Sequence, residues 1–266
     1  MTPFATYSQS ILAFPQDDML RLRFADWLDE HLNPLGEFIR VQWRLAGGKQ
    51  TAHCMCELET RERELLGEYE MDWAGELAPF VDYWVFRCGF VEEIALSAEA
   101  FLAYAERLFQ LAPIQVAHIH GTAGNIAALA GCPFLKRLRF LDFSDDRLGD
   151  AGVRILAQSP FLTQLEGLNL THCGIGDLGA LALASSPYLG RLRELFLDFN
   201  NISDSGAGAL AASAYMDRIN ALYVGYGNVT CRGQQALFER FGYRAPATDK
   251  TGRLQASAVL TAAGAG

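Results

Sequence analysis

The sequence predicts an α/β fold: a solenoid of short parallel strands that alternate with helices, preceded by a small α-helical N-terminal domain. Two observations carry this prediction. Four segments in the second half of the chain align without a gap, beginning at Leu138, Leu165, Leu192 and Ile219, so that successive units start 27 residues apart. Residues 1–48 instead carry apolar side chains at helical spacing and do not match the repeat.

Two amphipathic helices are expected in this N-terminal domain. The first starts after Pro15 and ends at Asn33-Pro34, and the second ends at Gly47-Gly48. Because each helix has one apolar face, the two should pack together as a helical hairpin. The apolar positions are Leu20, Phe24, Trp27 and Leu28 in the first helix and Phe38, Val41 and Leu45 in the second.

The segment Phe24–Gln42, FADWLDEHLNPLGEFIRVQ, resembles the repeat-companion domain, a bacterial module that typically precedes leucine-rich repeats. The resemblance covers about residues 9–46 and implies an architecture, with no catalytic activity attached to it. The turn His31-Leu32-Asn33 departs from the usual motif. The matching positions are Ala25, Asp26, Trp27, Leu28, Gly36, Glu37, Phe38, Ile39, Arg40 and Gln42.

The carboxylates of this segment raise the question of acid–base chemistry. A catalytic pair needs a shared cleft and two environments that separate the pKa values of its members. Asp26, Asp29 and Glu30 lie away from the apolar face of their helix, so we expect them on a solvated surface. We expect Asp26 to form an ion pair with Arg40 across the hairpin, which is a structural role.

Residues 49–90 should provide a helix and the N-terminal cap of the solenoid. A charged helix is expected from about Ala52 to Tyr69, and the run Tyr83–Phe86 followed by Phe90-Val91 predicts two extended segments around a turn. A solenoid requires such a cap because its first repeat otherwise exposes an apolar end.

The repeats extend over residues 91–244. Each of the four aligned units follows L-x-x-L-x-L-x-x-N/C-x-L, with Cys173 and Asn200 at the polar position and Asp146 and Gly227 as departures. A weaker unit begins at Leu111, and the segments between the units carry Ala and Leu at helical spacing. This pattern resembles the leucine-rich repeat family, specifically its ribonuclease-inhibitor-like class.

The end of the chain should close the solenoid. The segment RGQQALFERFGYR predicts a capping helix in which Leu237, Phe238 and Phe241 cover the last repeat. Residues 245–266 are rich in small residues, and we expect a disordered tail.

Composition narrows the class of partner. The chain of 266 residues has 22 basic and 31 acidic residues and a pI of about 5.1. This balance disfavours nucleic acid and anionic membrane as partners, and no segment is long and apolar enough to predict a membrane span. Six dispersed cysteines, including the pair Cys54 and Cys56, complete no disulfide framework or metal site, so we expect reduced thiols in a cytoplasmic protein without a cofactor.

The residues between the repeat leucines should face the open, concave side of the solenoid. Aromatic and acidic residues gather there in the last two units, which predicts a surface that binds a protein or peptide with a basic or apolar anchor. The alternative is that Phe199 and Tyr226 only fold over neighbouring loops. The predicted contact residues are Asp142, Asn169, Glu194, Phe196, Asp198, Phe199, Tyr223 and Tyr226. The predicted columns are Gln115, Asp142, Asn169, Phe196 and Tyr223; Ala117, Ser144, Thr171, Asp198 and Gly225; and His118, Asp145, His172, Phe199 and Tyr226.

A second hypothesis uses the last of these columns. His118, Asp145 and His172 would lie on successive strands, and two imidazoles beside a carboxylate could hold a divalent metal or act in hydrolysis. The outer two would be ~10 Å apart, which is wide for a metal site.

The sequence therefore predicts a non-enzymatic interaction module, an adaptor or a scaffold, that binds a protein on its concave face. A protein inhibitor of an enzyme is an alternative by analogy with the ribonuclease-inhibitor class.

Overall fold

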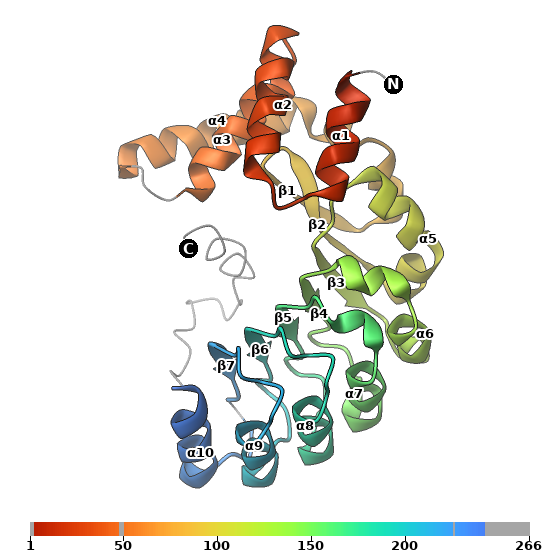
Figure 1. The fold of residues 1–266 in the computed structure, drawn as a ribbon, viewed down its shortest axis with the longest axis vertical. Coiled ribbons are helices and arrows are strands. Elements are labelled where there is room, and N and C mark those ends of the chain that lie inside the picture. Colours follow the sequence, from red (N-terminus) through yellow and green to blue (C-terminus); the bar gives the residue numbers. More distant parts are fainter. Residues whose placement is uncertain (1–2, 48–50, 226, 243–266) are drawn as a thin grey trace. The chain divides into compact units, whose positions relative to one another are not determined.

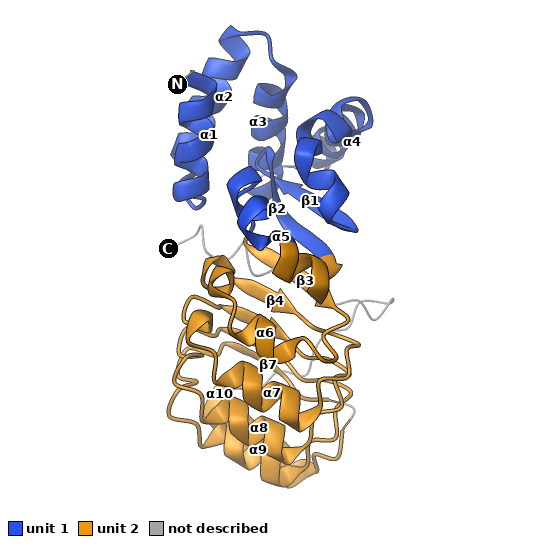
Figure 2. Cartoon of the chain, turned by 90° about the vertical axis from the view of Figure 1, so that its right-hand side faces the viewer, with its two compact units in different colours: residues 1–95, 104–114 blue, residues 96–103, 115–266 orange. Residues whose placement is uncertain are grey.

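The structure is a computed structural model that describes residues 3–47, 51–225 and 227–242. The predicted tail, 245–266, and Tyr226 lie outside the described residues. The chain divides into two compact units, residues 1–95 with 104–114 and residues 96–103 with 115–266 (Figure 2).

The first unit contains the N-terminal helices and an antiparallel strand pair. Its helices are α1 (Pro3–Ala13), α2 (Asp18–Glu30), α3 (Pro34–Ala46), α4 (Ala52–Ala74) and the 3-10 helix η1 (Gly75–Phe80). Strand β1 (Tyr83–Arg87) pairs with β2 (Phe90–Ser97), and α5 (Ala98–Leu111) follows; residues 96–103, the end of β2 and the start of α5, are assigned to the second unit. The two helices and the two extended segments predicted from the sequence are present, whereas no prediction covered α1.

The α2–α3 hairpin is held at a close helix crossing. A side chain at Gly36 would place its Cβ atom 2.9 Å from the carbonyl oxygen of Ala25 and 2.3 Å from Oδ1 of Asp29, so only glycine fits there. Arg40 donates hydrogen bonds to Asp26 at 2.5 Å and to Asp29 at 2.9 Å. The predicted pair between Asp26 and Arg40 is confirmed, and the second bond shows that Asp29 is also engaged.

Two buried polar side chains tie this hairpin to the strand pair. Gln42 donates to the carbonyl of Phe86 at 3.0 Å and accepts from the amide of Gly89 at 2.8 Å. Arg21, also buried, forms an ion pair with Glu92 and donates to the carbonyl of Arg87 at 2.9 Å. These contacts give Gln42 of the GEFIRVQ motif a structural role.

The second unit is built from repeated strand–helix pairs (Figure 1). Its strands are β3 (Val116–His120), β4 (Phe140–Asp142), β5 (Gly167–Asn169), β6 (Glu194–Phe196) and β7 (Ala221–Tyr223), each parallel to the next. The helices are α6 (Ile126–Ala130), α7 (Gly149–Ala157), α8 (Asp177–Ala184), α9 (Asp204–Ala211) and α10 (Cys231–Phe241), with 3-10 helices η2 (Pro133–Arg137) and η3 (Pro160–Leu162). The leucines Leu141, Leu168, Leu195 and Leu222 pair in register and are buried.

Polar side chains at equivalent positions join neighbouring repeats. Each helix from α7 to α9 carries an aspartate that accepts backbone N–H bonds at the start of the next helix, where the N–H groups lack helical partners. A serine after each helix donates to a carbonyl one repeat earlier, at 2.5 to 2.6 Å. The aspartates are Asp150, Asp177 and Asp204, and the serines are Ser159, Ser186 and Ser213.

The last helix covers the final repeat only in part. Leu237 is buried as predicted, but the side chain of Phe238 is 56% exposed, so the prediction for Phe238 is wrong. On α10, Phe238 follows the buried Leu237 directly, and adjacent helical positions point in different directions.

Candidate functional site

The strand face of the second unit, formed by β3 to β7 and the residues that follow them, carries the predicted contact residues that the structure describes, which are all but Tyr226. From β4 to β7 the paired residues are 27 positions apart, as predicted: Asp142 pairs with Asn169, Asn169 with Phe196, and Phe196 with Tyr223. Between β3 and β4 the offset is 24, and His118 pairs with Asp142. The first repeat is shorter because α6 has five residues, whereas α7 has nine.

This offset overturns the predicted column of His118, Asp145 and His172. His118 Nδ1 lies 3.1 Å from Oδ2 of Asp142, while His172 Nδ1 lies 2.8 Å from Oδ1 of Asp145. The three residues therefore form parts of two separate histidine–aspartate pairs. Within the described residues, no group of three or more His, Cys, Asp or Glu side chains is placed to hold a metal ion.

Asp142 and Asn169 belong to a hydrogen-bonded network at the centre of the face. Asn169 donates to Oδ2 of Asp142 at 3.0 Å, and the Ser144 amide donates to Oδ1 at 2.8 Å. Burial raises the pKa of Asp142, but the hydrogen bonds from His118 and Ser144 outweigh it and leave the pKa below its usual value. Asn169 is buried and Asp142 is nearly so, which makes both of them supports of the surface.

Aromatic rings form a continuous ladder on the strand face. The rings of Phe196 and Tyr223 stack with their centroids 4.6 Å apart, and Phe140 lies 6.2 Å from Phe196 on the other side. Phe140 reaches Phe196 across Gly167, where a Cβ atom would lie 2.2 Å from the Phe140 ring. Phe196 is only 5% exposed as a result, so the prediction that Phe196 is an exposed anchor is wrong.

Two carboxylates flank the end of this ladder. Glu194 is partly buried on β6, and burial raises its pKa. Asp198 accepts the Gly225 N–H at 2.5 Å, and its pKa is raised by burial despite that bond. Burial raises the pKa of Tyr223, and the two carboxylates add to the shift. Glu194 forms no side-chain hydrogen bond or ion pair with another residue in the part of the chain that the structure describes.

Phe199 differs from the other aromatic residues of the face. Its side chain is 52% exposed, and its backbone lies in the left-handed region at φ 58°. Asp145 and His172, at the equivalent positions of the preceding repeats, have φ values of 63° and 55°. A non-glycine residue in this region is strained by about 1 to 3 kcal/mol. The strand exit therefore projects Phe199 toward solvent. Tyr226, the next residue in this series, lies outside the described residues.

Comparison with known proteins identifies the repeat. A family model described as "Leucine Rich repeat" matches residues 161–184 and 192–211. With four parallel strands at a spacing of 27 residues, this match supports a leucine-rich repeat protein. The chain folds as a leucine-rich-repeat solenoid preceded by a helical region, which confirms the predicted fold class.

One solved structure similar to part of this leucine-rich-repeat chain is an internalin, InlF, from Listeria monocytogenes. It shares 14% sequence identity, with a TM-score of 0.27 over 54% of this chain and 45% of the internalin. This chain thus spans less than half of the internalin's length. No curated protein matches the sequence. No helix in the described part of the chain is long and apolar enough to cross a membrane.

Proposed function

We propose that this leucine-rich-repeat protein is a non-enzymatic interaction module, an adaptor or scaffold, that binds a protein or peptide at the β6–β7 end of its strand face. The contact surface consists of Glu194, Phe199 and Tyr223, with the buried residues Phe196, Asn169 and Asp198 beneath it. One observation supports this proposal most strongly. The carboxylate of Glu194 is partly buried, has no partner among the described residues, and lies beside a stacked pair of aromatic rings.

The chemistry of this surface favours a cationic side chain as the anchor of the partner. Burial has removed part of the hydration of Glu194, and an arginine or lysine of the partner would supply the missing hydrogen bonds. An arginine could also stack its planar guanidinium on Tyr223. The acidic balance of the whole chain, 31 acidic against 22 basic residues, agrees with a basic partner.

Two finer assignments belong to the same proposal. The alternation of strands and helices supports membership of the ribonuclease-inhibitor-like class. The Gly36 crossing and the contacts of Arg40 and Gln42 supply a physical role for the motif that resembles the repeat-companion domain. We propose the division into a helical module (1–48), a cap (49–90) and repeats (91–244), and a cytoplasmic location.

The test is affinity capture from a lysate of the cells that express the protein, with Glu194→Lys as the variant. A charge reversal at the anchor should remove the specific partner, and rising salt should weaken the wild-type complex. Glu239→Lys, the same charge change on exposed α10, is the matched control and should retain the partner. A partner retained equally by both variants would contradict the assigned surface.

A further inference from the structure

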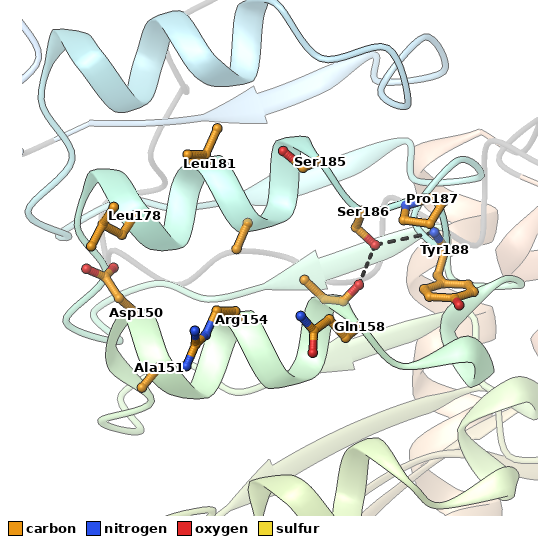
Figure 3. Close-up of a pocket in the computed structure, with 12 residues that line it drawn as sticks. Asp150, Ala151, Arg154, Gln158, Leu178, Leu181, Ser185, Ser186, Pro187 and Tyr188 are labelled. Carbon is orange, nitrogen blue, oxygen red and sulfur yellow. Dashed lines mark hydrogen bonds between the residues drawn. The ribbon is translucent and has the colours of Figure 1, made fainter.

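A groove on the helix side of the second unit is separate from the strand face. It runs between α7 and α8 with a volume of about 600 Å³ (Figure 3). Its lining is dominated by apolar atoms, among them those of Ala151 and Ala157 on α7 and Leu178 and Leu181 on α8. The loop Ser186–Tyr188 closes one end, where Ser186 donates to the Ala157 carbonyl at 2.6 Å and accepts the Tyr188 amide at 3.3 Å.

Leu178 and Leu181 on α8 are exposed, and the repeat does not require leucine at either position. Leu178 is 71% exposed and Leu181 is 49% exposed. At the equivalent outward positions the other helices carry small, polar or charged residues, so packing within the repeat does not call for leucine. These residues are Ala151 and Arg154 on α7, Ser205 and Gly208 on α9, and Arg232 and Gln235 on α10.

The charged groups of the groove define what could bind there. Asp150 accepts the amides of Gly176 at 2.7 Å and Gly179 at 2.9 Å, so its carboxylate is already engaged by the start of α8. The Arg154 guanidinium forms no hydrogen bond or ion pair with another side chain in the described ranges. An apolar groove with an uncommitted cation is complementary to an apolar segment that carries a carboxylate.

We propose that the α7–α8 groove binds an amphipathic helix of a protein partner, whose apolar residues cover Leu178 and Leu181 and whose carboxylate pairs with Arg154. The groove extends from Ala151 on α7 to Gln158, the residue that caps the C-terminal end of α7, which is about 10 Å or two helical turns. A helix of this length presents apolar anchors at positions i, i+3 or i+4, and i+7, the arrangement used when a helix binds in a groove.

The probe is a displayed library of short amphipathic helices, selected on the full chain alone and afterwards measured on Leu178→Ser/Leu181→Gln. These substitutions use residue types found at the same positions of α9 and α10, and circular dichroism checks that the variant folds. We expect selected peptides to share the apolar spacing and an acidic residue, and to bind the double variant about tenfold more weakly or worse. Phe238→Ser, which removes an exposed aromatic residue from α10, is the control and should bind as the wild type does.

Arg154→Glu tests the charge. In this variant, peptides with lysine in place of their acidic residue should bind better than the selected peptides. Failure to enrich any peptide, or equal binding to the wild type and the double variant, would overturn the proposal. A concentration-dependent dimer that disappears in the double variant would assign the groove to a second copy of the chain and would also overturn it.

Discussion

Replacing Asn200 with alanine should lower the free energy of unfolding, because the Asn200 side chain joins two neighbouring repeats. Asn200 is buried, and its Oδ1 accepts the amides of Cys173 at 3.1 Å and Ile175 at 2.9 Å. Its Nδ2 donates to the carbonyls of Leu170 at 2.8 Å and Leu197 at 3.0 Å. Alanine would leave both amides buried without an acceptor.

The expected loss follows from the two amides. A buried donor left without a partner costs about 1 to 3 kcal/mol, so two of them should lower the free energy of unfolding by about 2 to 6 kcal/mol. Urea denaturation followed by circular dichroism measures this loss, and hydrogen exchange should quicken at the amides of Cys173 and Ile175. Asn201→Ala, a change at the exposed neighbour, should lie within ~0.5 kcal/mol of the wild type. A loss below about 1 kcal/mol for Asn200→Ala would refute the reasoning.

Three further predictions concern other contacts. Gly36→Ala should destabilise the chain by about 1 to 3 kcal/mol because its Cβ would meet the Ala25 carbonyl, whereas Gly67→Ala, with open space around it in α4, should stabilise by up to ~1 kcal/mol in the same urea assay. Arg21→Met should lower the free energy of unfolding by about 3 to 5 kcal/mol by removing the cation that pairs with the buried Glu92 carboxylate, and adding Glu92→Leu should restore most of the loss; no recovery would contradict the paired role. Hydrogen bonding from Ser203 holds the pKa of Asp177 below its ordinary value of 3.8, so its contribution is present above that value and is lost as the pH falls through the lowered pKa; Asp177→Asn should flatten the acid end of a stability–pH curve, and an unchanged curve would count against this.

Much of the solenoid could be predicted because its periodicity is visible in the residues. The unit starting at Leu138 and its three successors keep one register in the structure as in the sequence. The Asp26–Arg40 pair was also predictable, since helical spacing placed both residues along the same hairpin.

The candidate site was harder to predict, for two physical reasons. A repeat of constant length could not reveal the shortened first unit, so His118 was assigned beside Asp145 although it pairs with Asp142. Periodicity also gives the side of a strand but not what covers it. Phe196 is buried because Gly167, one strand away, leaves room for the ring of Phe140. The glycine in LEGLNL was the available signal.

The aspartates and serines that join neighbouring repeats could be predicted as residues but not as contacts. Asp150, Asp177 and Asp204 recur every 27 residues, and the recurrence was visible as an acidic turn. Their contacts with the next helix depend on how closely neighbouring repeats stack. The residues of one repeat do not determine that distance.

The most direct test of partner binding at the strand face is site-specific photo-crosslinking in the cells that express the protein. A photoreactive phenylalanine analogue would replace Phe199 in one variant and Phe238 in another, since both side chains are exposed aromatics, at 52% and 56%, on different faces of the second unit. We predict a crosslinked partner at position 199, lost when Glu194→Lys is added, and none at position 238. A partner that crosslinks equally from both positions, or only from position 238, would contradict binding at the β6–β7 end of the strand face.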